Sequence, residues 1–169
     1  MKPVGRKVKG HNFERKVAKM LSDWWGERDS FVRTPGSGAY ARFVGEDLKD
    51  RLRGDLITPK EFPFFVECKC VEAFEFHLLL QSFEKSLFKN WFDEMEKKCR
   101  NYYPMLIFSR NRWKVFVCVR EGDLQKLGIS VNKRMTLDVG ERRYVFCLLE
   151  DFLSCVSPTQ VKNTPSSEV

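Results

Sequence analysis

One segment of the chain combines charge and extended structure in a way that suits chemistry. Glu67 and Lys69 stand two residues apart in Phe62–Val71, where most of the other residues are apolar or cysteine. Residues i and i+2 of a strand share one face, so both side chains can serve one site. Charges among apolar neighbours are costly unless they are paired or coordinating. The Glu-x-basic triplet also occurs at 14–16 and 96–98, in segments predicted as helices, where positions i and i+2 face apart.

A second carboxylate precedes this strand. Asp55 lies in Gly54-Asp55-Leu56-Ile57, and a hairpin through the prolines at 59 and 63 would bring it beside Glu67. Two carboxylates and a lysine suit metal-assisted phosphodiester hydrolysis, with Mg²⁺, or Mn²⁺ as a substitute, held by hard oxygen ligands. The metal would activate a bound water, and Lys69 would orient that water or stabilise the transition state as a point charge. The alternative is an ordinary Glu–Lys pair on an exposed strand face.

The residues around these positions predict alternating helices and strands. Apolar residues recur at helical spacing from about Asn12 to Trp25, and again from His77 to Cys99. We predict one domain over residues 1–156 with a basic arm at 1–10, and disorder in the polar segment 157–169. The remaining predicted elements are short strands at 30–33, 54–58, 105–109, 113–119 and 143–149, a loop at 34–38, a short helix at 123–127 and a hairpin around Gly140.

Composition limits the classes of protein to consider. The 169 residues carry a formal net charge of +7, and residues 1–19 contain seven basic residues against one acid. That excess favours a polyanionic partner. Hydrophobic residues at 43% and charged residues at 31% argue against a disordered chain. No apolar run approaches the ~20 residues of a membrane span, and the basic N-terminus leads into no signal-peptide core. Six cysteines without a C-x-x-C pair, beside two histidines, predict reduced thiols in the cytoplasm and no structural zinc site.

Four motifs in order carry a family resemblance. They are Phe13-Glu14-Arg15, the loop Arg33-Thr34-Pro35-Gly36-Ser37-Gly38-Ala39, Gly54-Asp55-Leu56-Ile57 and Val66-Glu67-Cys68-Lys69. With them the chain resembles the PD-(D/E)xK nuclease superfamily, and within it the archaeal and phage Holliday junction resolvases. The resemblance implies an α/β fold, restriction-endonuclease-like, with a mixed central β-sheet of about five strands flanked by α-helices.

The resemblance also implies roles for individual residues. Asp55, Glu67 and the backbone carbonyl of Cys68 would hold the metal, with Glu14 contributing directly or through water. Glu14, Asp55, Glu67 and Lys69 would form the catalytic set. Expected DNA contacts, from the resemblance and from the basic residues near the motifs, are Arg6, Lys7, Lys9, Arg15, Arg33, Ser37 and Arg42. Simpler roles remain open: Glu14 could complement a helix N-terminus, Arg33 could cover apolar surface, and the glycine-rich loop could be a plain turn.

These inferences predict a Mg²⁺-dependent endonuclease that cuts four-way junctions, with no organic cofactor and no membrane partner. Symmetric cutting would require a homodimer, and branched DNA would be recognised by shape through phosphate contacts. The expected location is the cytoplasm, that of the host if a phage encodes the chain. The alternatives are a less selective phage or restriction-type endonuclease, and a catalytically silent DNA-binding module of the same fold.

Overall fold

A five-stranded mixed sheet forms the centre of the molecule, which we describe from a computed structural model covering residues 5–35 and 46–162. The strand order is β3-β4-β5-β7-β6, in which β3 and β4 are parallel and the other pairs antiparallel. Two short strands, β1 and β2, form a separate antiparallel ladder. In chain order the elements are α1 (Arg6–Trp25), β1 (Val32–Arg33), α2 (Glu46–Arg51), β2 (Leu56–Ile57), β3 (Phe64–Val71), α3 (His77–Gln81), the 3₁₀ turn η2 (Phe83–Lys85), α4 (Leu87–Cys99), β4 (Tyr103–Arg110), β5 (Phe116–Arg120), α5 (Glu121–Lys126), β6 (Met135–Val139), β7 (Arg142–Leu148), α6 (Leu149–Cys155) and α7 (Pro158–Lys162).

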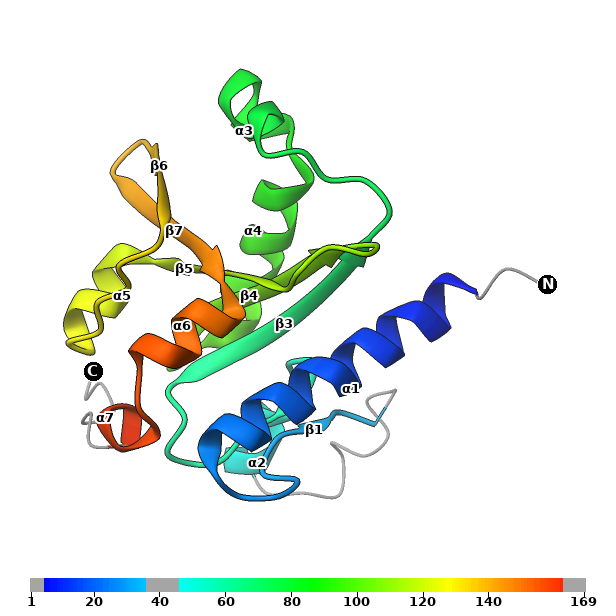
Figure 1. The fold of residues 1–169 in the computed structure, drawn as a ribbon, viewed down its shortest axis with the longest axis vertical. Coiled ribbons are helices and arrows are strands. Elements are labelled where there is room, and N and C mark those ends of the chain that lie inside the picture. Colours follow the sequence, from blue (N-terminus) through cyan, green and yellow to red (C-terminus); the bar gives the residue numbers. More distant parts are fainter. Residues whose placement is uncertain (1–4, 36–45, 163–169) are drawn as a thin grey trace.

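Helices cover both faces of this sheet (Figure 1). Alternate strand residues point to opposite faces, so β3 places Val66 and Cys68 in the core beneath α1, α5, α6 and α7. Phe65 of the same strand packs in the second core, beneath α3 and α4. The prediction of a mixed α/β fold with about five central strands is confirmed.

Helix α1 begins at Arg6, earlier than the predicted Asn12. Its buried residues start at Phe13, so the apolar periodicity marks only the part that contacts the sheet. Extending a helix that is already nucleated costs little, and α1 runs on through Gly10 into solvent. The predicted arm 1–10 is therefore helical over residues 6–10. The C-terminus is as expected, since Gly26 takes the left-handed conformation (φ 82°) that caps the helix.

The segment His77–Cys99 is not the single helix that its apolar spacing predicts. Two serines interrupt it: Ser82 has non-helical backbone angles (φ −159°, ψ 77°), and Ser86 is extended and accepts a hydrogen bond from the Lys89 amide. A serine in this geometry is a preferred N-cap, so α4 begins anew at Leu87. Figure 1 shows the resulting short helix α3 standing apart from α4.

The prediction of disorder from residue 157 is wrong for the part that the structure describes. Helix α7 packs Val161 into the core, where it is 1% exposed, and the Lys162 ammonium lies 4.4 Å from the centre of the Trp25 ring. The composition of this segment, three polar residues and a proline around one valine, led to the prediction of disorder although that valine is buried. Residues 163–169 lie outside the described residues. None of the described helices is long and apolar enough to cross a membrane.

Candidate active site

Asp55 lies against the free edge of β3, beside Glu67 as predicted, although the strand β2 that follows it pairs with β1 and not with β3 as the expected hairpin required. Its amide donates to the Val66 carbonyl at 3.1 Å, and its Oδ2 accepts from the Cys68 amide at 2.7 Å. Because β3 is the outermost strand of the sheet, these two backbone groups have no partner on a neighbouring strand. Asp55 therefore occupies the open edge and is fixed next to the two residues that flank Glu67.

The approach of this segment to β3 requires a glycine at position 54. A Cβ on Gly54 would lie 2.8 Å from the Val66 carbonyl oxygen and 3.4 Å from the Phe65 ring. Thr34 secures the other side of the segment, donating its hydroxyl to the Gly54 carbonyl at 2.8 Å and its amide to the Asp55 carbonyl at 2.9 Å. The Gly-Asp pair thus sets the distance between Asp55 and the strand.

Glu67 and Lys69 share the face of β3 that lies beneath α4, as the strand period predicts. The Glu67 side chain is only 5% exposed, and its Oε1 lies 3.2 Å from the Lys69 ammonium. A second ammonium, that of Lys98 on α4, lies 3.4 Å from the same oxygen. The other oxygen, Oε2, is buried and has no hydrogen-bond partner among the described residues. Both lysines hold one oxygen and leave the second available.

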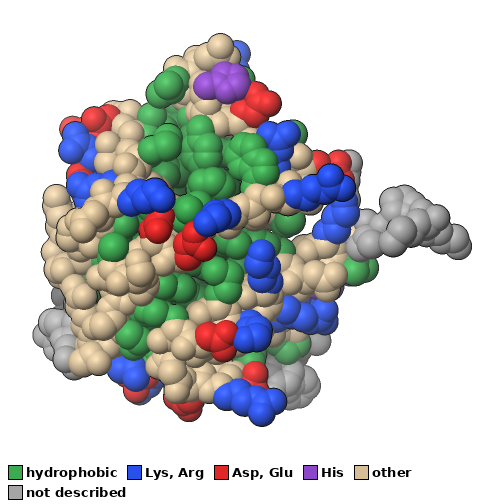
Figure 2. Space-filling view, in the orientation of Figure 1, with side chains coloured by type: hydrophobic (Ala, Val, Ile, Leu, Met, Phe, Trp, Pro, Cys, Tyr) green, Lys and Arg blue, Asp and Glu red, His purple; other side chains and the backbone are tan. Residues whose placement is uncertain are grey.

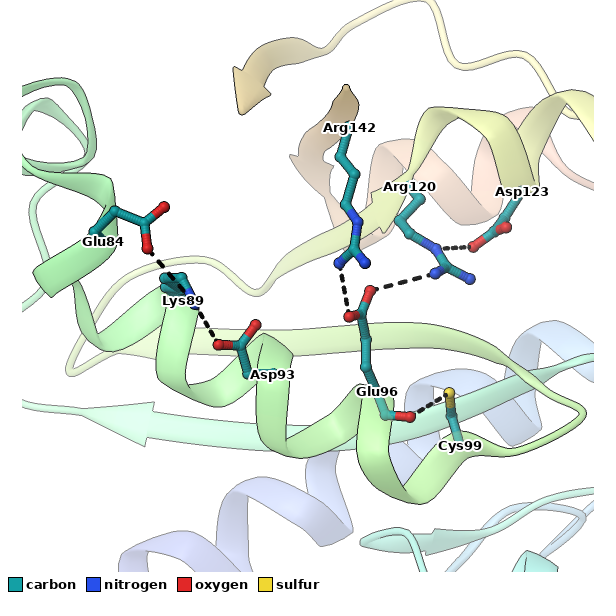
Figure 3. A network of polar contacts seen from close by, with 8 residues as sticks. All are labelled: Glu84, Lys89, Asp93, Glu96, Cys99, Arg120, Asp123 and Arg142. Atoms are coloured by element: carbon teal, nitrogen blue, oxygen red, sulfur yellow. Dashed lines mark hydrogen bonds and ion pairs between the residues drawn. The ribbon is translucent and has the colours of Figure 1, made fainter. Parts of the chain in front are cut away.

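Lys98 was not among the predicted site residues. It lies two positions after Glu96, and residues two positions apart in a helix point to opposite sides of that helix. Figure 3 shows the opposite flank, where Glu96 bonds Arg142 of β7 at 2.7 Å and Arg120 at 3.3 Å. These bonds tie the last turn of α4 to the far strands of the sheet, which leaves Lys98 directed toward β3. The triplet Glu96-Lys97-Lys98 was the sequence signal for Lys98, because Glu96 contacts the arginines of β5 and β7 while Lys98 contacts Glu67 of β3.

The environment of Asp55 disfavours its charged form. Burial and then the charge of Glu67 raise the pKa of Asp55 from 3.8 to about 6, with a smaller rise from Glu14. The Cys68 amide and Lys69 oppose the rise. A carboxyl with a raised pKa beside a second carboxylate is typical of a functional site.

The donor set at this edge fits a hard divalent cation. Asp55 and Glu67 offer carboxylate oxygens, and Glu67 Oε2 has no hydrogen-bond partner in the described part of the chain. Burial raises the pKa of Asp55 most, and a cation would relieve the repulsion from Glu67 that adds to the rise. Within residues 5–35 and 46–162, no group of three or more His, Cys, Asp or Glu residues is arranged to hold a metal. Two carboxylates and a backbone carbonyl, completed by water and substrate, match the sparse protein ligation that Mg²⁺ accepts.

Glu14 and Arg33 pair with each other. The Arg33 Nε lies 2.5 Å from Glu14 Oε2, and both side chains are largely buried, at 18% and 16% exposure. This pair joins α1 to β1. The charge of Glu14 adds to the raised pKa of Asp55, and among the described residues no hydrogen bond or ion pair joins Glu14 to Glu67 or Lys69.

The other predicted DNA-binding residues lie along α1 or outside the described part. Arg15 is exposed and lines, with Arg33, a groove of about 850 Å³ between α1 and β1. Neither Asp55 nor Glu67 lines that groove. Lys7 is exposed, and Lys9 pairs with Glu72 at 3.2 Å. Ser37, Arg42 and the side chain of Arg6 lie outside what the structure describes.

Comparison with protein-family models gives a match that spans the whole described range of the chain. Residues 5–163 match the family described as "Phage putative PDDEXK endonuclease". No curated protein and no solved structure matches the sequence.

Proposed function

The chain belongs to this family of phage PDDEXK endonucleases, and from that premise we propose that it hydrolyses DNA phosphodiesters at the edge of β3. Asp55 and Glu67 are the proposed metal ligands, with the Cys68 carbonyl between them. The observation that carries the proposal is the buried Glu67 oxygen, which has no hydrogen-bond partner within residues 5–35 and 46–162, beside an aspartate with a raised pKa.

Mg²⁺ bound there would supply an activated water and neutralise the charge that develops on the phosphate. The chain's own residues do the rest. Asp55 is oriented by the Cys68 amide, and Lys69 and Lys98 hold Glu67 by one oxygen. Lys69, 27% exposed, is the ammonium closest in sequence to the carboxylates and is proposed to stabilise the phosphate as a point charge.

Substitution of the two carboxylates tests this proposal. Asp55→Asn and Glu67→Gln should each abolish Mg²⁺-dependent cutting of labelled duplex while DNA binding survives. Glu94→Gln, an exposed position on α4, is the matched control and should cut as wild type. Cutting by both site variants at the wild-type rate would refute the assignment. Binding by wild type without cutting in Mg²⁺ or Mn²⁺ would instead favour a DNA-binding module.

Four-way junctions are the narrower substrate that we propose. The order of the four motifs supports it, and symmetric cutting of a junction needs two sites related by a two-fold axis, hence a homodimer. The test compares junction with linear duplex of the same sequence, and sedimentation gives the mass in solution. Equal cutting rates on the two substrates would contradict junction specificity and indicate a general DNA endonuclease. A monomer in solution that cuts both junction strands independently would contradict the homodimer.

A further inference from the structure

A groove lined by charges of one sign lies at the C-terminal end of β3, outside the carboxylate site. It measures about 470 Å³ and separates α1 from the turn between β4 and β5. We call it the Lys16–Arg112 groove. Its lining consists of Lys9, Asn12, Phe13, Lys16, Cys70, Asn111 and Arg112. Three of these residues are cationic, two are amides and none is acidic.

Two rigid walls form this groove. Positions 9, 12, 13 and 16 lie on one face of α1, and Phe13 is buried against the sheet, so the helix wall is anchored. The opposite wall is the β4–β5 turn, where the Asn111 amide donates to the Val71 carbonyl at the end of β3 at 3.1 Å. Arg112 adopts a positive φ of 64°, which turns the chain sharply at that point. Figure 2 shows Lys and Arg side chains on the surface over α1 and over this turn.

The cations of the groove are not all neutralised by the protein. Lys9 pairs with Glu72 at the rim, an exposed pair of modest strength. Lys16 and Arg112 are exposed, and neither forms an ion pair with any of the described residues. A polyanion would therefore meet two cations, one on each wall of the groove, that have no ion-pair partner among the residues described.

The groove lies farther along β3 than the proposed active site, on the α1 face of the strand rather than on the face of Glu67 and Lys69. Cys70 in its floor is two residues beyond Cys68, or about 7 Å at the rise of a strand. Successive phosphates of one DNA strand advance by about 3.4 Å along the helix axis. A DNA strand that ran parallel to β3, with its cleaved phosphate at the carboxylates, would pass Cys70 about two nucleotides from the cut.

We propose that the Lys16–Arg112 groove binds DNA backbone phosphates on one side of the cleavage position. Lys16 and Arg112 contact the phosphates from opposite walls, and Asn12 and Asn111 offer amide donors between them. The position of the cut in this inference rests on the proposed function, whereas the binding itself does not.

Salt-dependent binding tests the groove without cleavage. Affinity for a labelled duplex is measured in EDTA over a range of NaCl concentrations for Lys16→Gln, Arg112→Gln and the double variant. Each lost phosphate contact should reduce the slope of log K against log salt by about 0.9, which amounts to about fivefold weaker binding at 150 mM NaCl. The control is Lys60→Gln, an exposed lysine at the opposite end of β3, which should bind as wild type. All three positions are exposed, and equal melting temperatures would exclude misfolding.

Phosphate ethylation interference then locates the contacts. Interfering phosphates should lie on one side of the cut, and the double variant should lose them. Slopes equal to that of Lys60→Gln in both single variants would overturn the proposal, as would an acidic peptide that binds wild type and competes at the groove more strongly than DNA. If wild type never cuts DNA but the slopes fall, the groove stands and the nuclease proposal fails. If wild type cuts and the slopes do not change, the reverse holds.

Discussion

Asp55→Asn should make the protein more stable at neutral pH while it removes activity. Folding raises the pKa of Asp55 from 3.8 to about 6, so the native state binds its proton more tightly than the unfolded state does. Stability contributed by this carboxyl is therefore greatest in acid and is lost as the pH rises from about 4 to above 6. A shift of about two pKa units corresponds to about 3 kcal/mol of lost stability at pH 8.

An asparagine at position 55 avoids that loss. Its side-chain oxygen can still accept the hydrogen bond from the Cys68 amide, which Asp55 accepts at 2.7 Å. In urea titrations at pH 8 the variant should gain up to about 3 kcal/mol, or about 6–12 °C in melting temperature for a chain of this length. The gain should vanish near pH 4, where the native carboxyl is protonated. Added Mg²⁺ should raise the stability of wild type and leave that of the variant unchanged.

Asp138→Asn is a control with the opposite sign. The Arg143 guanidinium lowers the pKa of Asp138, so its contribution is present at neutral pH and is lost in acid. That variant should be slightly less stable than wild type at pH 8, and the gap should close in acid. If Asp55→Asn is no more stable than wild type at pH 8, or if its effect does not change with pH, then Asp55 is not held in an unfavourable charged state. The electrostatic case for a cation at this edge would fall with it.

Three further perturbations follow from other contacts. Lys98→Met should slow cutting about tenfold with little change in DNA affinity, because the buried glutamate of β3 loses one of its two ammonium partners. Lys98→Arg should restore most of the rate, and Lys97→Met should have no effect. Equal losses of rate in the two methionine variants would contradict a specific role of Lys98. Gly54→Ala should lower the free energy of unfolding by about 1–3 kcal/mol and reduce cutting, since its Cβ would lie 2.8 Å from a carbonyl oxygen of β3. Gly122→Ala, which has open space around it in α5, should be neutral or stabilising. Equal melting temperatures of the two variants would count against the close approach at Gly54. Glu96→Gln should lower the free energy of unfolding by about 1 kcal/mol in low salt. The loss should be smaller in 1 M NaCl, because salt screens the attraction between Glu96 and its two arginine partners. A loss that does not depend on salt would point to packing instead.

The strand that carries the chemistry was predictable because its signal is local. Period-2 alternation placed Glu67 and Lys69 on one face, and the prolines after Ile57 indicated the turn that returns the chain to β3. The glycine at position 54 was also visible in the sequence. The structural need for that glycine could not be predicted, because the close approach of its backbone to β3 depends on which edge of the sheet is free.

Contacts between elements distant in sequence were beyond the sequence argument. Lys98 reaches Glu67 across 31 positions, and the choice of that lysine over Lys97 depends on which flank of α4 faces β3. The Glu14–Arg33 pair presents the same difficulty, since the sequence marked both residues and assigned each to a ligand rather than to the other. Residue type indicates what a side chain can bind, and only the packing of helices on the sheet decides which partner is near.

The excess positive charge near the N-terminus has a different physical meaning once α1 is seen to begin at Arg6. A flexible arm would lose conformational entropy on binding DNA, whereas cations on a formed helix have already lost it. Arg15 lies in the groove beside β1 and Lys16 in the groove beside the β4–β5 turn, so adjacent residues face opposite sides of one helix. Since α1 is packed on β3 through Phe13 and Val17, both charges keep fixed distances from Asp55 and Glu67. Phosphates bound by such a helix would determine which phosphodiester reaches the carboxylates, and a disordered arm of the same charge could only raise the affinity.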